Sequence, residues 1–114
     1  MRRTVKTFKA LSDSNRIRIL KMLEVRPLCV CEITHVLDLA SSTVSKHLSI
    51  LRDADFIVDR KDGKWVNYCL NQDAAQHPIR DLLPLLSEWL PDDKTIMLDK
   101  EKLKSTDRNQ LCGL

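Results

Sequence analysis

The four cysteines of this chain are the residues whose type and spacing point most directly to chemistry: Cys29, Cys31, Cys69 and Cys112. Cys29 and Cys31 are two positions apart, and in a regular helix this spacing turns their side chains about 200° away from each other. Both sulfurs can therefore bind one small ion only if the backbone at Cys29 is non-helical or becomes so. Thiolate ligands select soft ions over magnesium or calcium. Buried core positions and redox-active thiols are the alternative interpretations.

The thiols are expected to be reduced, because the composition is that of a self-supporting domain rather than a disulfide scaffold. A chain of 114 residues and 13.2 kDa with 43% hydrophobic and 31% charged residues can bury a core of its own. No run approaches the roughly 18 apolar residues of a membrane span. The basic start at 1–6 has no apolar segment behind it, as a secretory signal would. We therefore expect a cytoplasmic single-domain protein.

Apolar residues at helical spacing predict four helices in the first half of the chain. These helices are expected around 5–11, 17–23, 29–37 and 41–54. Segment 12–14 breaks the first pattern and offers a cap for the second helix, which ends near Pro27. Ser41 or Ser42 is expected to cap the fourth helix.

After Asp55 the period changes from that of a helix to that of strands. Segments 57–60 and 65–70 are rich in β-branched and aromatic residues. The Asp62-Gly63 pair between them is a strong hairpin signal, because both positions of such a turn favour positive φ. Helical spacing returns after Pro78 and stops at 91–93.

This order of elements is that of a winged helix-turn-helix, a mainly α fold with a β-hairpin wing. Short hydroxyls and cations near the start of the helix 41–54 can reach bases and phosphates, and the hairpin can follow the backbone. The candidate DNA-binding residues are Ser41, Ser42, Thr43, Ser45, Lys46 and His47 on the helix and Arg60, Lys61 and Lys64 on the hairpin. An ordinary capped surface helix and a polar turn are the alternatives. Residues 1–26 carry eight basic and two acidic side chains, which suits a polyanionic partner.

Three segments, in this order, resemble the ArsR/SmtB family of metalloregulatory repressors. Residues 10–20 are similar to the signature of that family's second helix, and 42–52 to its recognition helix. Residues 28–33 resemble the metal box of its arsenic- and cadmium-responsive members. The resemblance covers roughly residues 5–90. It implies a homodimeric winged-helix repressor that needs no cofactor to bind double-stranded operator DNA and leaves it when an inducer binds.

The resemblance also implies that Cys29 and Cys31 bind the inducer, with arsenite or antimonite expected and Cd(II) or Pb(II) as the alternatives. The arsenic-responsive pattern has a third cysteine three residues beyond the second, where this chain has Thr34. The cadmium-responsive pattern draws cysteines from an N-terminal extension, and residues 1–16 contain none. The third ligand must therefore come from elsewhere or be absent.

Cys112 is the preferred third ligand, because it lies on a tail of about twenty residues that can span tens of ångströms. Cys69 on the hairpin is a weaker candidate, since only an unforeseen contact would bring it to Cys29. His35 shares a helix face with Cys31 and could complete a Zn or Cd site, but it is a poor ligand for arsenite.

The last predicted helix carries an apolar stripe that is unusually wide for a lone terminal helix: Ile79, Leu82, Leu83, Leu86 and Leu90, with Trp89 beside it. We expect it to pack in a dimer with Val5 and Phe8 of the first helix, and an intramolecular core is the alternative. Zinc-sensing members of the resembled family place paired His and carboxylate ligands on this helix. After His77 this chain has Asp81 and Glu88 but no further His, so that site is expected to be missing.

We divide the chain into a DNA-binding and dimerisation domain at 1–92 and a tail at 93–114, which is weakly periodic and expected to be partly disordered.

Two other functions remain open. One is a thiol redox switch in which Cys29, Cys31 or Cys112 forms a disulfide on oxidation. The other is a winged-helix module that binds protein rather than DNA. An enzyme is least expected, because no nucleophile triad, phosphate loop or carboxylate pair is recognisable.

Overall fold

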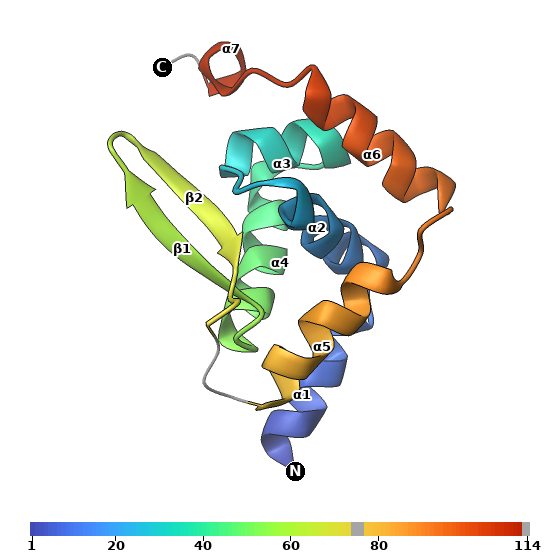
Figure 1. The fold of residues 1–114 in the computed structure, drawn as a ribbon. Coiled ribbons are helices and arrows are strands. Elements are labelled where there is room, and N and C mark those ends of the chain that lie inside the picture. The colour runs from blue at the N-terminus through green and yellow to red at the C-terminus, as the bar shows by residue number, and fades with distance from the viewer. Residues whose placement is uncertain (74–76, 113–114) are drawn as a thin grey trace.

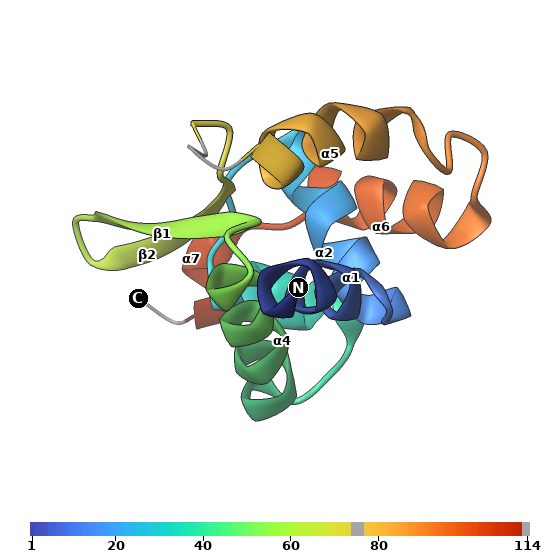
Figure 2. The same ribbon diagram turned by 90° about the horizontal axis from the view of Figure 1, so that it is seen from below.

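The computed structural model describes residues 1–73 and 77–112, without the side chains of His77 and Cys112. Its helical body carries one two-stranded hairpin that projects as an arm (Figures 1 and 2). The elements are α1 (Arg2–Leu11), α2 (Ser14–Val25), α3 (Val30–Leu37), α4 (Ser41–Asp53), β1 (Ile57–Asp62), β2 (Trp65–Leu70), α5 (His77–Glu88), α6 (Lys94–Lys104) and α7 (Arg108–Cys112). The mainly α winged helix-turn-helix prediction is confirmed. None of the described helices has the length and apolar character that a membrane crossing requires.

The start of α2 is capped where the sequence predicts it. The Asp13 carboxylate accepts hydrogen bonds from the backbone N–H groups of Asn15 at 2.8 Å and Arg16 at 3.2 Å. Burial alone would raise the pKa of Asp13, but these two N–H donors and the nearby His47 and Arg16 charges lower it overall. Asp13 therefore fixes the residue at which α2 begins.

The predicted cap of α4 is wrong by one residue. Ala40, in extended conformation, is the N-cap, and no side chain caps this end. The Ala40 carbonyl accepts the first helical hydrogen bond from Val44 N at 3.1 Å. Ser41 and Ser42 therefore lie inside the first turn, and their hydroxyls do not cap the helix. The helix ends at Asp53, one residue before the predicted end.

The hairpin turn is also shifted by one residue from its prediction. Asp62 pairs with Trp65, so the two loop residues are Gly63 and Lys64. Gly63 has φ +61°, and it is the one residue of this turn with positive φ. Glycine at the first loop position is the feature of a type II′ turn, whereas the sequence favoured type I′ on Asp62-Gly63. Lys64 consequently stands at the tip of the wing.

The core is shared by the helical body and the base of the hairpin. α2 contributes Ile19, Leu20 and Met22, and it contacts both α4 and α6. The other largest buried apolar side chains are Leu28, Ile33, Leu48, Leu51, Phe56, Ile57 and Ile79. Figure 1 shows α2 in the middle of the body, with α4 and α5 on either side of it. Burial of this α2 face holds α4 and the hairpin to one rigid support.

Most of the apolar stripe on α5 belongs to the intramolecular core. Ile79, Leu83 and Leu86 are buried within the protomer. Trp89 and Leu90 remain 46% and 41% exposed. The intramolecular alternative therefore explains the inner part of the stripe, and only its end remains free for other contacts.

The segment after α5 is more ordered than its weak periodicity predicts, since α6 and α7 occupy most of it. The Arg18 guanidinium donates two hydrogen bonds of 2.9 Å to the buried Asp99 carboxylate, which joins α2 to α6. Hydrogen bonding to Asp99 raises the pKa of Arg18. Ile96 and Leu103 are buried. A paired carboxylate and two apolar side chains thus anchor a helix whose surface is otherwise charged.

Candidate metal centre and nucleic-acid interface

α3 and α4 form the helix-turn-helix, and α4 presents the predicted polar face to solvent. The turn between them begins at Asp38, which is left-handed (φ 55°, ψ 47°) and donates its N–H to Thr34 O at 2.8 Å. Val44, Leu48 and Leu51 of α4 are buried. The exposed candidate DNA contacts on this helix are Ser41, Ser42, Thr43, Ser45 and Lys46. The periodicity therefore separated the two faces of α4 correctly.

His47, which the sequence placed among the DNA contacts, interacts with Arg16 of α2. Its Nδ1 lies 3.2 Å from Nη1 of Arg16, and its side chain is half-buried. Arg16 also donates to the carbonyls of Ala10 and Lys9, both at 2.9 Å. One guanidinium thus ties the end of α1 and the start of α2 to the middle of α4.

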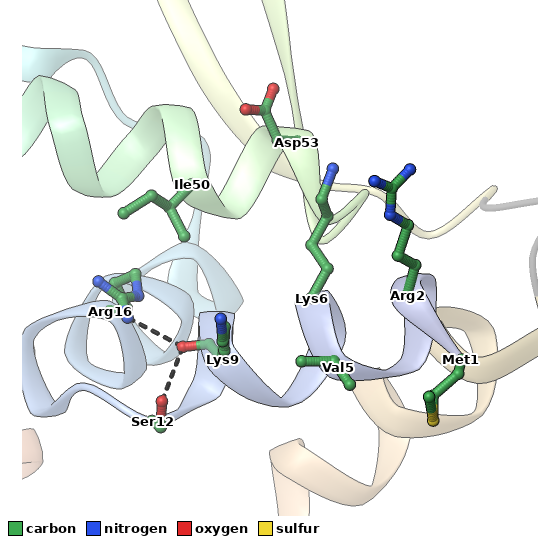
Figure 3. A pocket seen from close by; sticks show the side chains of 9 residues that line it. All are labelled: Met1, Arg2, Val5, Lys6, Lys9, Ser12, Arg16, Ile50 and Asp53. Carbon is green, nitrogen blue, oxygen red and sulfur yellow. Dashed lines mark hydrogen bonds between the residues drawn. The ribbon is translucent and has the colours of Figure 1, made fainter.

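A basic cavity of about 670 Å³ lies beside α4, between it and α1. Figure 3 shows Arg2 and Lys6 extending from α1 towards the end of α4, where Asp53 lies. Lys9 and Arg16 add two cations to its lining. The positive charge of the N-terminal segment is therefore gathered next to the candidate recognition helix. Such a concentration of charge favours a polyanion.

The candidate contacts of the wing are all exposed to solvent. Arg60, Lys61 and Lys64 are all exposed, and Lys64 Nζ lies 5.5 Å from the centroid of the Trp65 ring. Arg52 at the end of α4 pairs with Asp59 of β1 at 3.6 Å. The Arg52–Asp59 pair links the arm to the end of α4.

Cys29 lies outside the regular helix, which is the condition that a shared cysteine site requires. The helix begins at Val30, one residue later than predicted, and Cys29 is its N-cap with an extended backbone (φ −88°, ψ 167°). The 200° separation expected for two helical cysteines therefore does not apply to Cys29 and Cys31. The Cys29 thiol is free and only 4% exposed.

Two sets of contacts hold Cys29 in this conformation. The preceding residue, Leu28, forms a two-hydrogen-bond bridge with Tyr68 of β2, at 3.1 and 2.7 Å. The Cys29 N–H donates to the Glu32 carboxylate at 3.0 Å, and Arg26 donates to the same carboxylate at 2.7 Å. Glu32 is the functional residue that sequence reasoning missed. An acidic residue three positions after an N-cap is the capping-box signal that could have revealed it.

Burial is the main cause that raises the pKa of the Cys29 thiol. The backbone N–H of Glu32 lowers it in part, and the Glu32 carboxylate raises it further. Cys29 is therefore a protonated thiol at neutral pH, beside a buried charge that disfavours the bare thiolate.

The other three cysteines differ in their bonding state and in the element that carries them. The expectation of reduced thiols is wrong for Cys31, which is half-buried in the first turn of α3 and disulfide-bonded, whereas Cys69 on β2 is a free thiol. α7 packs against α3 and ends at Cys112, whose side chain lies outside the described residues. In Figure 1 the tail passes over the body so that α7 comes back to α3. The chain thus returns the backbone of its last cysteine to the helix that contains Cys31 and is preceded by Cys29.

The weaker candidate ligands are not gathered around Cys29. His35 is exposed on the last turn of α3. Cys69 lines a cavity with Leu23 and Arg60, and Cys29 is absent from that lining. No group of three His, Cys, Asp or Glu side chains able to hold a metal occurs among the described residues.

Comparison with known proteins relates this architecture to bacterial regulators. The family model described as bacterial regulatory protein, arsR family, matches residues 13–58. The chain is 38% identical over 90 residues to the arsenic resistance transcriptional regulator ArsR1 of Pseudomonas putida, covering 75% of this chain and 70% of that one. It is 41% identical over 68 residues to the arsenical resistance operon repressor of Escherichia coli K12, covering 59% and 58% of the two chains.

Solved structures give the same relationship. HlyU from Vibrio cholerae aligns with a TM-score of 0.63 and 30% identity, covering 77% of this chain and 91% of that one. The cadmium metal-sensor CMTR from Mycobacterium tuberculosis aligns with a TM-score of 0.59 and 30% identity, covering 77% and 84%. The helix-turn-helix and the wing found here thus recur in regulators with similar sequences.

Proposed function

Because this chain belongs to the arsR family of bacterial regulatory proteins, we propose that it is a metalloid-responsive transcriptional repressor. It binds operator DNA and leaves it when arsenite or antimonite binds its cysteines. Relatives with 38% and 41% identity are named as arsenic resistance regulators, which supports this inducer class. A repressor acts where the chromosome is, so this function places the protein in the cytoplasm.

The proposed inducer site consists of Cys29, Cys31 and Cys112. The observation that carries this proposal is the packing of α7, which ends at Cys112, against α3. The disulfide at Cys31 indicates that a second sulfur comes within bonding distance of that side chain. Once the thiols are reduced, arsenous acid exchanges its three hydroxyl groups for three cysteine sulfurs and releases three water molecules. No net proton is released, so a buried neutral thiol such as Cys29 is a suitable ligand.

DNA binding is assigned to the exposed face of α4 and to the wing. The hydroxyls of Ser41, Ser42, Thr43 and Ser45 and the Lys46 ammonium contact bases and phosphates, and Arg60, Lys61 and Lys64 contact the backbone. His47 acts mainly by holding Arg16, as its 3.2 Å contact suggests. The basic cavity between α1 and α4 adds further phosphate attraction.

A homodimer presents two copies of α4 to successive half-sites. The side chains available for the dimer interface are Val5, Phe8, Leu85, Trp89 and Leu90, all large, apolar and exposed on α1 and the end of α5. A monomer would leave this apolar surface in water, which supports a partner of the same chain.

Inducer binding weakens DNA binding because α3 and α4 pack on each other. A metalloid held between Cys29 and the tail fixes the start of α3, and α4 shifts with it. The inducer therefore stabilises a conformation that fits DNA poorly, and by linkage DNA weakens the inducer by the same factor.

A redox switch is the second candidate function, and the disulfide at Cys31 favours it. In that case an oxidant such as peroxide takes two electrons from two thiols, and the resulting disulfide releases DNA without a metal. A cadmium- or lead-responsive repressor is the third possibility, with Cys29 and Cys31 joined by a ligand other than a third thiol.

Fluorescence anisotropy of the reduced protein on DNA from its own promoter separates these functions. At fixed salt the complex is titrated in turn with arsenite, cadmium, zinc and peroxide. Release by arsenite, and its loss in Cys29→Ser and Cys112→Ser, supports the proposal. Release by cadmium alone, or by peroxide alone, selects one of the other two. A complex that no reagent dissociates contradicts all three.

A further inference from the structure

The short helix α7 contacts the wing as well as α3, and Arg108 makes the contacts to the wing. Its Nη1 donates to Asn67 Oδ1 at 3.0 Å, and its Nη2 lies 3.9 Å from Asp62 Oδ2. The guanidinium also lies 4.6 Å from the centroid of the Trp65 ring. All three partners belong to the two strands of the hairpin.

Arg108 is well suited to fix an orientation rather than to add charge alone. Its planar fork meets an amide oxygen, a carboxylate and an aromatic face at once, which a lysine cannot do. The side chain is only 31% exposed, although it lies on the last helix of the chain. The same α7 also packs against α3. A helix of five residues therefore bridges the element that carries Cys29 and Cys31 and the element that carries the wing contacts.

We propose that Arg108 is a positioning residue that transmits inducer binding to the wing. This inference rests on the proposed function, in which Cys112 of α7 is a ligand. Cys112 lies four residues after Arg108, so an inducer that fixes Cys112 fixes Arg108 within about one helical turn. Arg108 then holds Trp65 and Asn67 in a single orientation relative to α3.

The consequence reaches the proposed DNA contacts through Trp65. The ring of Trp65 is approached by Arg108 and also by Lys64, whose ammonium lies 5.5 Å from the ring centroid at the tip of the wing. A wing held by α7 loses the freedom to adjust Lys64 to the DNA backbone. Docked and released α7 are thus two states, and the inducer and DNA favour opposite ones.

The test compares the apparent Kd for promoter DNA with and without saturating arsenite. The wild-type ratio is expected to be about 10 or more, within the usual range of allosteric coupling. Arg108→Ala should lower this ratio to about 2 or less while still taking up one arsenite per inducer site. Lys104→Ala is the matched control, because it removes one positive charge from the same tail, and Lys104 is an exposed side chain that pairs with the exposed Glu101. This control should keep the wild-type ratio.

Asn67→Ala, on the wing side of the contact, should lower the ratio as well, and the double variant should lower it no further than Arg108→Ala alone. If Arg108→Ala did not fold, Asn67→Ala and Arg108→Lys would carry the same test. If Arg108→Ala takes up arsenite normally and keeps the same Kd ratio as the wild-type protein, the role of Arg108 is overturned and the proposed function stands. If the wild-type protein itself has a Kd ratio of one, the proposed function is contradicted, and this inference with it.

Discussion

The backbone N–H of Cys29 donates a 3.0 Å hydrogen bond to the carboxylate of Glu32, which is buried. The same carboxylate accepts a 2.7 Å hydrogen bond from Arg26, so both of its oxygens are engaged. This arrangement keeps the Cys29 residue extended at the start of α3, where the backbone N–H of Glu32 also faces the Cys29 sulfur. The conformation of Cys29 in the proposed inducer site therefore depends on this capping interaction.

We predict that Cys29 is alkylated much more slowly than Cys69 in the native reduced protein at pH 8. Burial raises the pKa of Cys29 above its ordinary value of 9.0, and only 4% of the residue is exposed, so both the thiolate fraction and access are low. Cys69 is half-buried. Timed iodoacetamide labelling with peptide mass spectrometry measures both rates, and in urea the two should converge. Equal native rates would refute the burial of Cys29.

The raised pKa also predicts how stability depends on pH. Because the folded protein holds the Cys29 proton more tightly, this group contributes stability that is fully present below the unfolded pKa. That stability is lost as pH rises from the unfolded value through the folded one, hence above about pH 9. Cys29→Ser should remove this part of the alkaline loss. Urea midpoints between pH 7 and 10 for both proteins check the prediction, and identical profiles would contradict it.

Arsenite and cadmium should differ in the pH dependence of their affinity. Exchange of arsenous acid with neutral thiols releases water but no net proton, so its affinity should stay nearly constant between pH 6 and 8. Cadmium must displace thiol protons, and its affinity should fall by about tenfold per displaced proton for each unit of decreasing pH. Competition titrations at three pH values measure both slopes. An arsenite affinity that falls as steeply as that of cadmium would argue against three neutral thiols.

Arg18→Ala should destabilise the protein by about 3 kcal/mol, because it leaves the buried Asp99 carboxylate without its cation. Lys104→Ala is the control, since the Lys104–Glu101 pair is exposed and should contribute less than about 1 kcal/mol. Urea unfolding with unchanged m-values measures both. An equal, small loss in the two variants would mean that α6 is not held by this pair.

The elements of the core could be predicted from the sequence because their signals are local. The spacing of Val44, Leu48 and Leu51 placed the inner face of α4, and Asp13 was recognisable as part of a cap. Gly63 marked a hairpin, but strand register decided whether the two-residue loop was Asp62-Gly63 or Gly63-Lys64. Register is set by pairing along both strands, which no short motif reveals.

The packing of the tail could not be predicted, since it depends on contacts distant in sequence. Asp99 is 81 residues from Arg18, and Arg108 is 41 from Asn67. Each looked like an ordinary surface charge. The burial that makes them important arises only when α6 folds back on α2 and α7 on α3.

The assignment of the DNA surface predicts changes in salt dependence. Lys46→Ala and Lys64→Ala should each weaken DNA binding and reduce the slope of log Kd against log salt by about two per dimer, about one for each copy. Both residues are exposed, on α4 and at the tip of the wing. Lys104→Ala removes the same charge outside the proposed interface and should leave the slope unchanged. Anisotropy titrations from low to moderate salt decide this, and a Lys64→Ala slope equal to that of wild type would remove the wing from the interface.

The central claim is that the tail completes a three-sulfur site with the start of α3. X-ray absorption at the arsenic edge on the reduced protein with one equivalent of arsenite per inducer site counts the sulfur neighbours of arsenic. The account predicts three sulfurs and no oxygen in the wild-type protein, and two sulfurs with one oxygen in Cys112→Ser. Two sulfurs and one oxygen in both proteins would contradict the claim, because the tail would then contribute nothing to the bound inducer.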